Sequence, residues 1–306
     1  MNQVKNSLPI TEAQNLRTTT IDTLSSLEIV KLINDEDATV APTVRQVLSQ
    51  IARAVDVTVK RLQRGGRLLY FGAGTSGRLG VLDASEIPPT FSAPPDLVQG
   101  FIAGGDDALR QSVEAAEDDP EAGAQVVQDV GVSEADVVVG ITASGGTPWV
   151  LGALAEAQRR GAATVALTCN PDSPAAYEAD VVIALVVGPE VIAGSSRMKA
   201  GTAQKMVLNM LSTATMIRLG KVFGNLMIDV QPTNAKLRRR ALRILQEAAS
   251  VDQETARRAL EVTGYAVKPA LVMLLVDVDA AEARQRLAEA GGSVRRAVEV
   301  EKKKSP

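Results

Sequence analysis

The chain has 306 residues, a formal net charge of −3 at pH 7, 45% hydrophobic and 23% charged residues, and no histidine. The length and apolar fraction are typical of a soluble globular protein with one large and one small domain, or two domains. The small net charge indicates no nucleic-acid or anionic-membrane partner. The absence of histidine excludes Ser-His-Asp and Cys-His catalysis and metal sites made of histidine. Any proton transfer at neutral pH must therefore use Asp, Glu, Lys, Tyr or the single cysteine, Cys169.

Helices and strands alternate through the first part of the chain. Apolar spacing predicts helices at 24–35, 43–64, 76–85, 107–118 and 121–129, from Pro148 to about Arg160, and over GTAQKMVLNMLSTATMIRLGKVFG. Buried strands are predicted in RLLYFGAG, DLVQGFIAGG, ADVVVGITASGG, GAATVALTCN and ADVVIALVVG. This alternation, with nearly continuous apolar strands, indicates an α/β fold in which helices cover both faces of a parallel sheet.

Glycine, proline and a change in composition set the expected boundaries. The Gly65-Gly66 pair should end the second helix, and Pro88-Pro89 should stop the helix at 76–85. After about residue 235 the sequence is charged, with helices expected at 235–248, 253–263, 267–275, 280–289 and 292–300. We therefore expect an N-terminal helical segment at 1–53, a sheet domain at 54–235 and a small C-terminal helical domain at 236–306.

The sequence also indicates where the protein works. The single Cys169 cannot form an internal disulfide, which is typical of a reducing compartment. The opening residues, MNQVKNSLPITEAQN, lack the apolar core of a signal peptide. No apolar run reaches the ~18 residues that a membrane-spanning helix needs. We expect a cytoplasmic protein without a membrane span.

Three loops that follow predicted strands share one chemistry. Each supplies hydroxyl groups, glycine N–H groups and the start of a helix, a combination that suits an oxyanion such as phosphate. Ligands of open parallel sheets bind beyond the carboxyl ends of the strands, where these loops are expected. The candidate binding residues are Gly74, Thr75, Ser76, Gly77 and Arg78 in the first loop, Ser144, Gly145 and Thr147 in the second, and Ser195, Ser196, Arg197 and Lys199 in the third.

These loops also have two plainer interpretations. Serine and threonine are common helix N-caps, although three such loops are harder to explain this way than one, and the third, AGSSRMKAGT, adds two cations. Residues 72–77 also match the dinucleotide pattern G-x-G-x-x-G. The acidic residue that this pattern needs, about 20 residues further on, is missing, because the second strand ends in FIAGGDD with Asp106 too distant. The sequence therefore does not favour dinucleotide binding.

The carboxylates near these loops could transfer protons. Glu86 is predicted at the end of a helix, where a merely solvated carboxylate would meet an unfavourable dipole. Glu114 and Glu117 lie three residues apart and would share a helix face, although a charged exterior is the plainer explanation. Carboxylates in different environments can serve as acid and base. The residues alone thus indicate a phosphosugar-binding α/β protein and allow a carboxylate acid–base enzyme.

The sequence resembles the N-acetylmuramic acid 6-phosphate etherases of the sugar-isomerase (SIS) domain superfamily. The resemblance covers nearly the whole chain, through LSSLEIVKLINDED, GAGTSGRLGVLDASEIPPTF, FIAGGDDALRQSVEAAEDD, ITASGGTPWVLGAL, GSSRMKAGTAQKMVLNMLSTATMIRLGKVFGNLMIDV and VDAAEARQRLAEAGGSVRRAV. It implies an SIS-type sheet and cleavage of the D-lactyl ether of N-acetylmuramic acid 6-phosphate, in cell-wall amino-sugar recycling. The implied lyase route eliminates D-lactate and then hydrates the intermediate to N-acetylglucosamine 6-phosphate, with no cofactor and no metal.

The resemblance also implies roles for the carboxylates. Glu86 in DASE matches the general acid that protonates the lactate oxygen, and Glu117 in VEAAED matches the general base, with Glu114 as the alternative. It further implies a homodimer with the active site near the interface and a small-molecule sugar phosphate as the partner. Gly146 stands where the family often has arginine. Two alternatives remain: an amino-sugar phosphate isomerase of the same superfamily, and a sugar-phosphate sensor related to the longer glucokinase regulatory proteins.

Overall fold

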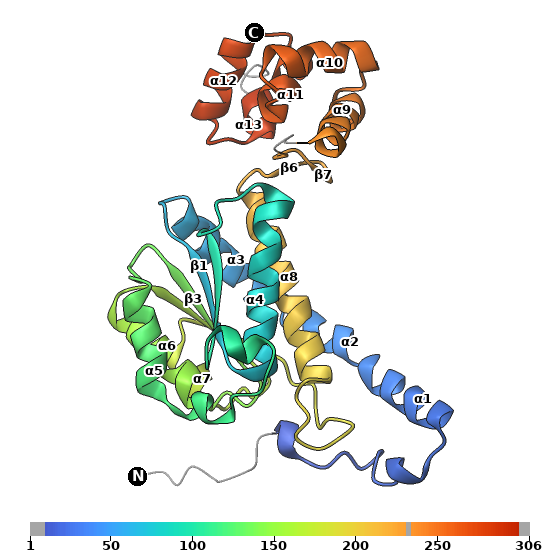
Figure 1. Ribbon diagram of the computed structural model, residues 1–306, viewed down its shortest axis with the longest axis vertical. Coiled ribbons are helices and arrows are strands. Elements are labelled where there is room, and N and C mark those ends of the chain that lie inside the picture. Colours follow the sequence, from blue (N-terminus) through green and yellow to red (C-terminus); the bar gives the residue numbers. More distant parts are fainter. Residues whose placement is uncertain (1–9, 231–233, 300–306) are drawn as a thin grey trace. The chain divides into compact units, whose positions relative to one another are not determined.

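The fold is given by a computed structural model that describes residues 10–230 and 234–299 (Figure 1). The chain forms two compact units. One consists of Met1–Glu86 and Pro95–Ser212, and the other of Ile87–Pro94 and Thr213–Pro306. None of the helices in the described ranges is both long and apolar enough to cross a membrane. Residues 1–9 of the opening segment MNQVKNSLPITEAQN lie outside the described residues, as does the last residue of the helix predicted at 292–300.

The first unit contains a five-stranded sheet in the order β2-β1-β3-β4-β5, with every pair parallel. The strands are β1 (Leu68–Gly72), β2 (Val98–Ile102), β3 (Val137–Thr142), β4 (Ala163–Thr168) and β5 (Val181–Ala184). All residues of β1, β3 and β4 are buried, which explains why their sequences show continuous apolar runs rather than alternation. The predicted parallel α/β sheet is confirmed.

Helices cover both faces of this sheet (Figure 1). On one face, Leu69 and Phe71 of β1 pack with residues of α5 (Pro120–Asp129) and α6 (Pro148–Arg159). Because neighbouring strand residues point to opposite faces, Tyr70 points the other way, and its hydroxyl donates to Asp83 of α4 (Gly74–Phe91) at 2.9 Å. The core of the unit therefore lies on both sides of β1 and β3.

The strand order defines a binding position. The chain places β2 on one side of β1 and then β3 on its other side, so the direction of winding reverses between β1 and β3. The loops that leave the carboxyl ends of these two strands diverge, and open α/β sheets bind ligands in the resulting crevice. The first two hydroxyl-rich loops of the sequence are these loops.

The helix predicted at 24–35 is present as α1 (Ser26–Asp37), but the helix predicted at 43–64 is divided. Its residues belong to α2 (Val40–Arg45) and α3 (Leu48–Leu62). The start of α1 is fixed by a capping box, in which Ser25 and Glu28 each bind the other's backbone N–H. The expected single helix at 43–64 is interrupted because Val47, at φ −112° and ψ 17°, leaves the helical region.

The expected helix stop at Pro88-Pro89 is wrong, because α4 continues to Phe91. A proline inside a helix removes a hydrogen bond and costs about 3 kcal/mol. Ile87 and Phe91 are buried, with 4% and 7% of their surface exposed, and such burial contributes about 1.5–3 kcal/mol for each side chain. Tertiary packing therefore offsets the local preference for a break.

The predicted helix at 107–118 is also wrong. This segment contains two short 3-10 helices, η3 (Asp106–Leu109) and η4 (Glu114–Asp118). A new helix, α5, then starts where Asp119 accepts a hydrogen bond from the N–H of Ala122, with Pro120 in the first helical position. The residue before a proline is driven to extended backbone, so Asp119–Pro120 separates the two regions.

The second unit is built around one apolar helix. Its helices are α9 (Ala235–Ala249), α10 (Gln253–Val262), α11 (Val267–Val276), α12 (Ala280–Glu289) and α13 (Val294–Glu299), close to the predicted ranges. Helix α11 contacts the other four. Asn234, Asp252 and Asp279 cap the starts of α9, α10 and α12. A short hairpin that was not predicted, β6 (Val222–Phe223) and β7 (Leu226–Met227), precedes them.

Candidate functional site

The first loop joins β1 to α4 through closely packed glycines. A Cβ atom on Gly77 would lie 2.6 Å from the carbonyl oxygen of Gly72 and 2.6 Å from Cγ1 of Ile102. Gly72 and Gly77 of the G-x-G-x-x-G match are therefore needed for the packing of α4 on β1 and β2, whereas Gly74 has a φ of +51°, which favours glycine. The packing of helix on sheet therefore explains the glycine pattern at residues 72–77 without a bound nucleotide.

The same loop places a polar group at the start of α4. Ser76 lies in the first helical turn, and its hydroxyl donates to Oε1 of Gln204 on α8 (Lys199–Arg218) at 2.9 Å. The starts of the two helices are in contact, since a Cβ atom on Gly201 would meet Cγ2 of Thr75 at 3.3 Å. The first N–H groups of α4 have no partner within the helix, so this position suits an oxyanion.

The second loop, between β3 and α6, is held by hydroxyl groups. The side-chain oxygens of Thr142 and Thr147 are 2.8 Å apart, and the N–H of Gly145 donates to Thr142 at 3.2 Å. The N–H of Gly146 donates to Ser144 at 3.2 Å. Thr142 was not predicted, because it belongs to the buried strand and only the structure turns its hydroxyl into the loop.

Gly145 is the tightest position of this loop. Its φ is +75°, and a Cβ atom there would lie 2.1 Å from Oγ of Ser173. At Gly146, by contrast, the nearest atom to such a Cβ is Oγ of Ser144, at 3.9 Å. Gly146 is exposed, so the loop has room for a side chain at this position.

The third loop is organised by a buried carboxylate that was not predicted. Glu190 accepts hydrogen bonds from the backbone N–H groups of Lys199 and Ala200 at 3.0 and 2.9 Å, and so occupies the start of α8. Burial raises the pKa of Glu190 above its usual range. An anion bound at this end of α8 would have to displace Glu190, so the first turn of α8 differs from that of α4.

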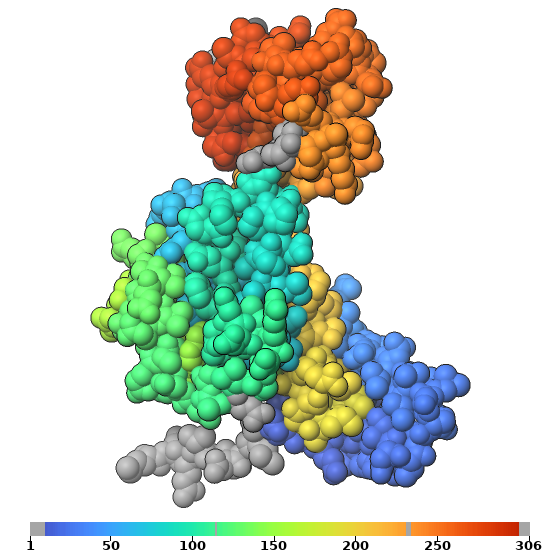
Figure 2. All heavy atoms as spheres, viewed as in Figure 1, coloured from blue at the N-terminus to red at the C-terminus, as the bar shows by residue number. Residues whose placement is uncertain are grey.

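Lys199 is directed to the N-terminal segment. Its ammonium, on a side chain that is 3% exposed, donates to Oε2 of Glu36 at 2.6 Å, and Arg17 donates to the other oxygen at 2.7 Å. Burial alone would raise the pKa of Glu36, but Lys199 and Arg17 hold it below its usual value. Figure 2 shows the start of α8, in yellow, against the blue N-terminal segment.

The remaining predicted residues of the third loop are more accessible. Ser195 and Ser196 are half-buried, and Arg197 is exposed. Arg78, predicted in the first loop, donates to the carbonyl oxygens of Leu109 and Gln111, both at 3.2 Å. Its guanidinium thereby ties α4 to the segment that leads to η4.

The two principal carboxylates lie in different places. Glu117 is exposed and belongs to η4, in the connection that follows the carboxyl end of β2. Glu114 starts the same 3-10 helix. Glu86 is exposed near the far end of α4, about 15 Å along the helix axis from Ser76 at 1.5 Å per residue. Within one chain, the structure brings Glu117 to the edge that carries the loops and leaves Glu86 away from it.

A buried polar cluster behind the first loop was not predicted. Asp83 of α4 accepts hydrogen bonds from Tyr70 of β1 at 2.9 Å and from Ser212 of α8 at 3.1 Å. Burial raises the pKa of Asp83 to about 6. The cluster ties α4 to the sheet and to α8. Its only sequence signal is an acidic residue on a helix face that is otherwise apolar.

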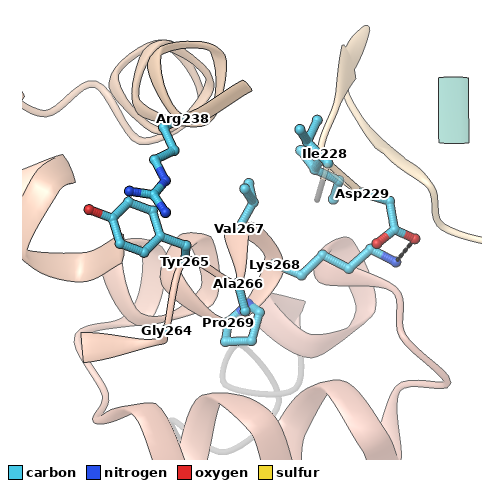
Figure 3. A pocket seen from close by; sticks show the side chains of 10 residues that line it. Ile228, Asp229, Arg238, Gly264, Tyr265, Ala266, Val267, Lys268 and Pro269 are labelled. Atoms are coloured by element: carbon cyan, nitrogen blue, oxygen red, sulfur yellow. Dashed lines mark ion pairs between the residues drawn. The ribbon is translucent and has the colours of Figure 1, made fainter. Parts of the chain in front are cut away.

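Two hollows in the structure contain none of the predicted residues. One of about 300 Å³ lies between α4, β2, α5 and α6 and is lined by Val81, Phe101, Ala122, Val126 and Trp149, among others. The other, of about 480 Å³, is in the C-terminal unit (Figure 3). There the Arg238 guanidinium lies 5.0 Å from the centre of the Tyr265 ring, and Lys268 pairs with Asp229 at 3.1 Å. Because neither hollow contains a predicted residue, the candidate site is the carboxyl edge of the sheet, where the hydroxyl-rich loops lie.

Comparison with known proteins identifies the domains of the chain. Family models match at residues 50–158 (glucokinase regulatory protein N-terminal SIS domain), 112–214 (SIS domain) and 224–269 (C-terminal lid domain of glucokinase regulatory protein). A phosphoheptose isomerase from Francisella tularensis, 20% identical, aligns with 63% of this chain and 100% of its own at a TM-score of 0.50. That likeness supports the fold alone, and the sheet is of the SIS type.

Closer relatives align with nearly the whole chain. The chain is 56% identical over 290 residues to the N-acetylmuramic acid 6-phosphate etherase of Edwardsiella ictaluri, covering 95% of this chain and 97% of that protein. It is 54% identical over 293 residues to the protein of the same name from Brucella anthropi, covering 96% and 95%.

Proposed function

The chain belongs to the N-acetylmuramic acid 6-phosphate etherase family, and we propose that it cleaves the D-lactyl ether of N-acetylmuramic acid 6-phosphate to N-acetylglucosamine 6-phosphate and D-lactate. The observation that carries this function is the 56% identity to a relative of that name over 95% of the chain. It makes the protein a carbon–oxygen lyase of cell-wall amino-sugar recycling. Because its substrate is a phosphorylated sugar, which cells hold in the cytoplasm, we assign it to that compartment.

The proposed mechanism uses two carboxylates. Glu117 removes the C2 proton, which the C1 aldehyde of the open-chain sugar makes acidic, and Glu86 protonates the lactate oxygen as the bond to C3 breaks. Water then adds at C3 of the unsaturated aldehyde. Glu114, in the same 3-10 helix as Glu117, is the alternative base. The exposure of Glu86 and Glu117 is compatible with contact to a ligand at the surface.

The loops supply the proposed phosphate and sugar contacts. Gly74, Thr75, Ser76 and Gly77 at the start of α4, and Ser144, Gly145 and Thr147 after β3, flank the crevice between β1 and β3. Ser195, Ser196 and Arg197 would contact the ligand from the third loop. Lys199 and Arg78 would support the site indirectly, since their charged groups are engaged with Glu36 and with two backbone carbonyls.

The position of Glu86 supports a homodimer with a shared site. A phosphate at Ser76 and a carboxylate at Glu86 of the same chain are separated by about 15 Å along α4, further than one small sugar phosphate spans. We therefore assign Glu86 to the site of a second copy, as a closed symmetric dimer allows. Exposed apolar side chains on the first unit offer a surface for that copy: Leu16, Leu27, Val30, Leu82 and Ile192.

The function is tested by D-lactate release from N-acetylmuramic acid 6-phosphate. Glu86→Gln and Glu117→Gln should each lower turnover by roughly 10²–10⁴, as for a lost general acid or base. Glu178→Gln, which changes an exposed glutamate at the end of α7 (Pro174–Glu178), is the matched control and should retain full activity. A folded wild type that binds sugar phosphates but releases no D-lactate would instead indicate an isomerase or a sensor.

A further inference from the structure

The amide of Gln204 is an unusual group at the edge of the candidate site. Gln204 lies on α8 with 1% of its surface exposed, and its Oε1 accepts the hydrogen bond from the Ser76 hydroxyl at 2.9 Å. Its Nε2 is buried and has no hydrogen-bond partner among the residues that the structure describes. Buried side-chain amides are normally paired at both ends, so the unpaired nitrogen needs a reason.

The orientation of this amide decides what Ser76 can bind. A serine hydroxyl has one proton to donate, and here that proton is directed to Gln204. A phosphate oxygen beside the start of α4 would act as an acceptor. Ser76 therefore cannot donate to it while it donates to Oε1 of Gln204.

A half-turn of the Gln204 amide, which exchanges Oε1 and Nε2, would pair the nitrogen and would free the Ser76 hydroxyl to donate to a phosphate. Nε2 of Gln204 would then donate to a lone pair of Ser76 Oγ, and the Ser76 proton would be released for another acceptor. The turn leaves Oε1 as the unpaired end, and an under-satisfied buried carbonyl is more readily tolerated than a buried N–H without a partner. The close approach of α8 to α4 at Gly201 and Thr75 keeps the two side chains within reach.

We propose that Gln204 is a positioning residue for the oxyanion site. It holds the Ser76 hydroxyl when the site is empty. When a phosphate binds at the start of α4, the amide turns, Nε2 donates to Ser76 and Ser76 donates to the phosphate. Only hydrogen bonds are exchanged. The inference rests on the proposed function in taking a sugar phosphate as the ligand.

A double-mutant cycle tests the coupling between Gln204 and Ser76. The Kd of N-acetylglucosamine 6-phosphate is measured by titration calorimetry for wild type, Gln204→Met, Ser76→Ala and the double variant. Gln204→Met should weaken binding by about fivefold, the mean effect of a hydrogen bond between neutral groups, because the bound state loses the bond from Nε2 to Ser76. In the Ser76→Ala background, the same change should cost less than about twofold, because the hydroxyl that Gln204 positions is gone.

Controls separate this role from a structural one. Thr215→Val removes another buried hydroxyl of α8 that has no partner among the described residues, and it should leave the Kd unchanged. If Gln204→Met does not fold, Gln204→Glu serves instead. Its ionised carboxylate accepts from Ser76 but cannot donate, so binding should again weaken more with Ser76 present than with Ser76→Ala.

The outcomes are distinct. Equal weakening in both backgrounds, or none in either, would overturn the positioning role of Gln204. A wild type that binds no sugar phosphate would overturn it as well. A wild type that binds the sugar phosphate but releases no D-lactate would remove the etherase function alone, and the cycle on Gln204 and Ser76 would still decide this inference.

Discussion

A mixed dimer of two inactive variants should recover activity if Glu86 works in the site of the other copy. Consider one subunit with Glu86→Gln and a partner subunit with Glu117→Gln. One site of this dimer then combines an intact Glu117 with an intact Glu86, while the other site lacks both. The separation of about 15 Å between Ser76 and Glu86 along α4 is the structural reason for expecting this arrangement.

The magnitude follows from counting sites. Each parent homodimer should fall by roughly 10²–10⁴ in turnover. The purified mixed dimer has one intact site of two and should show about half of the wild-type activity. The two variants can be expressed together with different affinity tags, purified through both tags in turn, and assayed for D-lactate release.

The control is a dimer that carries both tags and Glu86→Gln in both subunits, which should stay inactive. A mixed dimer that is as inactive as its parents would refute the shared site and would place Glu86 in the site of its own chain or outside the reaction. A monomeric wild type with full activity, in sedimentation at assay concentration, would refute it independently.

Three further predictions concern the first unit. Burial raises the pKa of Asp83 to about 6, so between about pH 4 and 6 the folded state binds more protons than the unfolded state, and stability falls as pH rises. The free energy of unfolding of the wild type should therefore fall by about 3 kcal/mol between pH 4 and pH 7 from this group. In urea titrations, Asp83→Asn should remove that loss. Gly145→Ala should destabilise the protein by about 2 kcal/mol or more, because φ is +75° and the new methyl would strike Ser173, whereas Gly146→Ala should change the thermal midpoint little. Burial raises the pKa of Cys169 to about 12, so a thiol reagent at pH 8 should label it only after unfolding, and labelling of the native protein would contradict its buried position.

Much of the fold could be predicted from local patterns. The β1, β3 and β4 segments are apolar throughout because both faces of the sheet are covered. The starts of α9, α10 and α12 carry Asn234, Asp252 and Asp279, whose side chains cap the helices, so their positions were close to the expected ones. The errors arose where packing overrode local preference, as at Pro88-Pro89 within α4.

The alternation of strands and helices, the hydroxyl-rich loops at the strand ends and the family could be recognised from the sequence, because each of these is encoded in a contiguous stretch of residues. Only the tertiary structure showed that Glu190 occupies the start of α8, that Lys199 pairs with Glu36, and that Gln204 faces Ser76. These pairs join residues on different elements, and their partners are fixed by the packing of helices on the sheet. A buried polar group is stable only if the fold brings it a partner, and the linear pattern does not specify which partner that is.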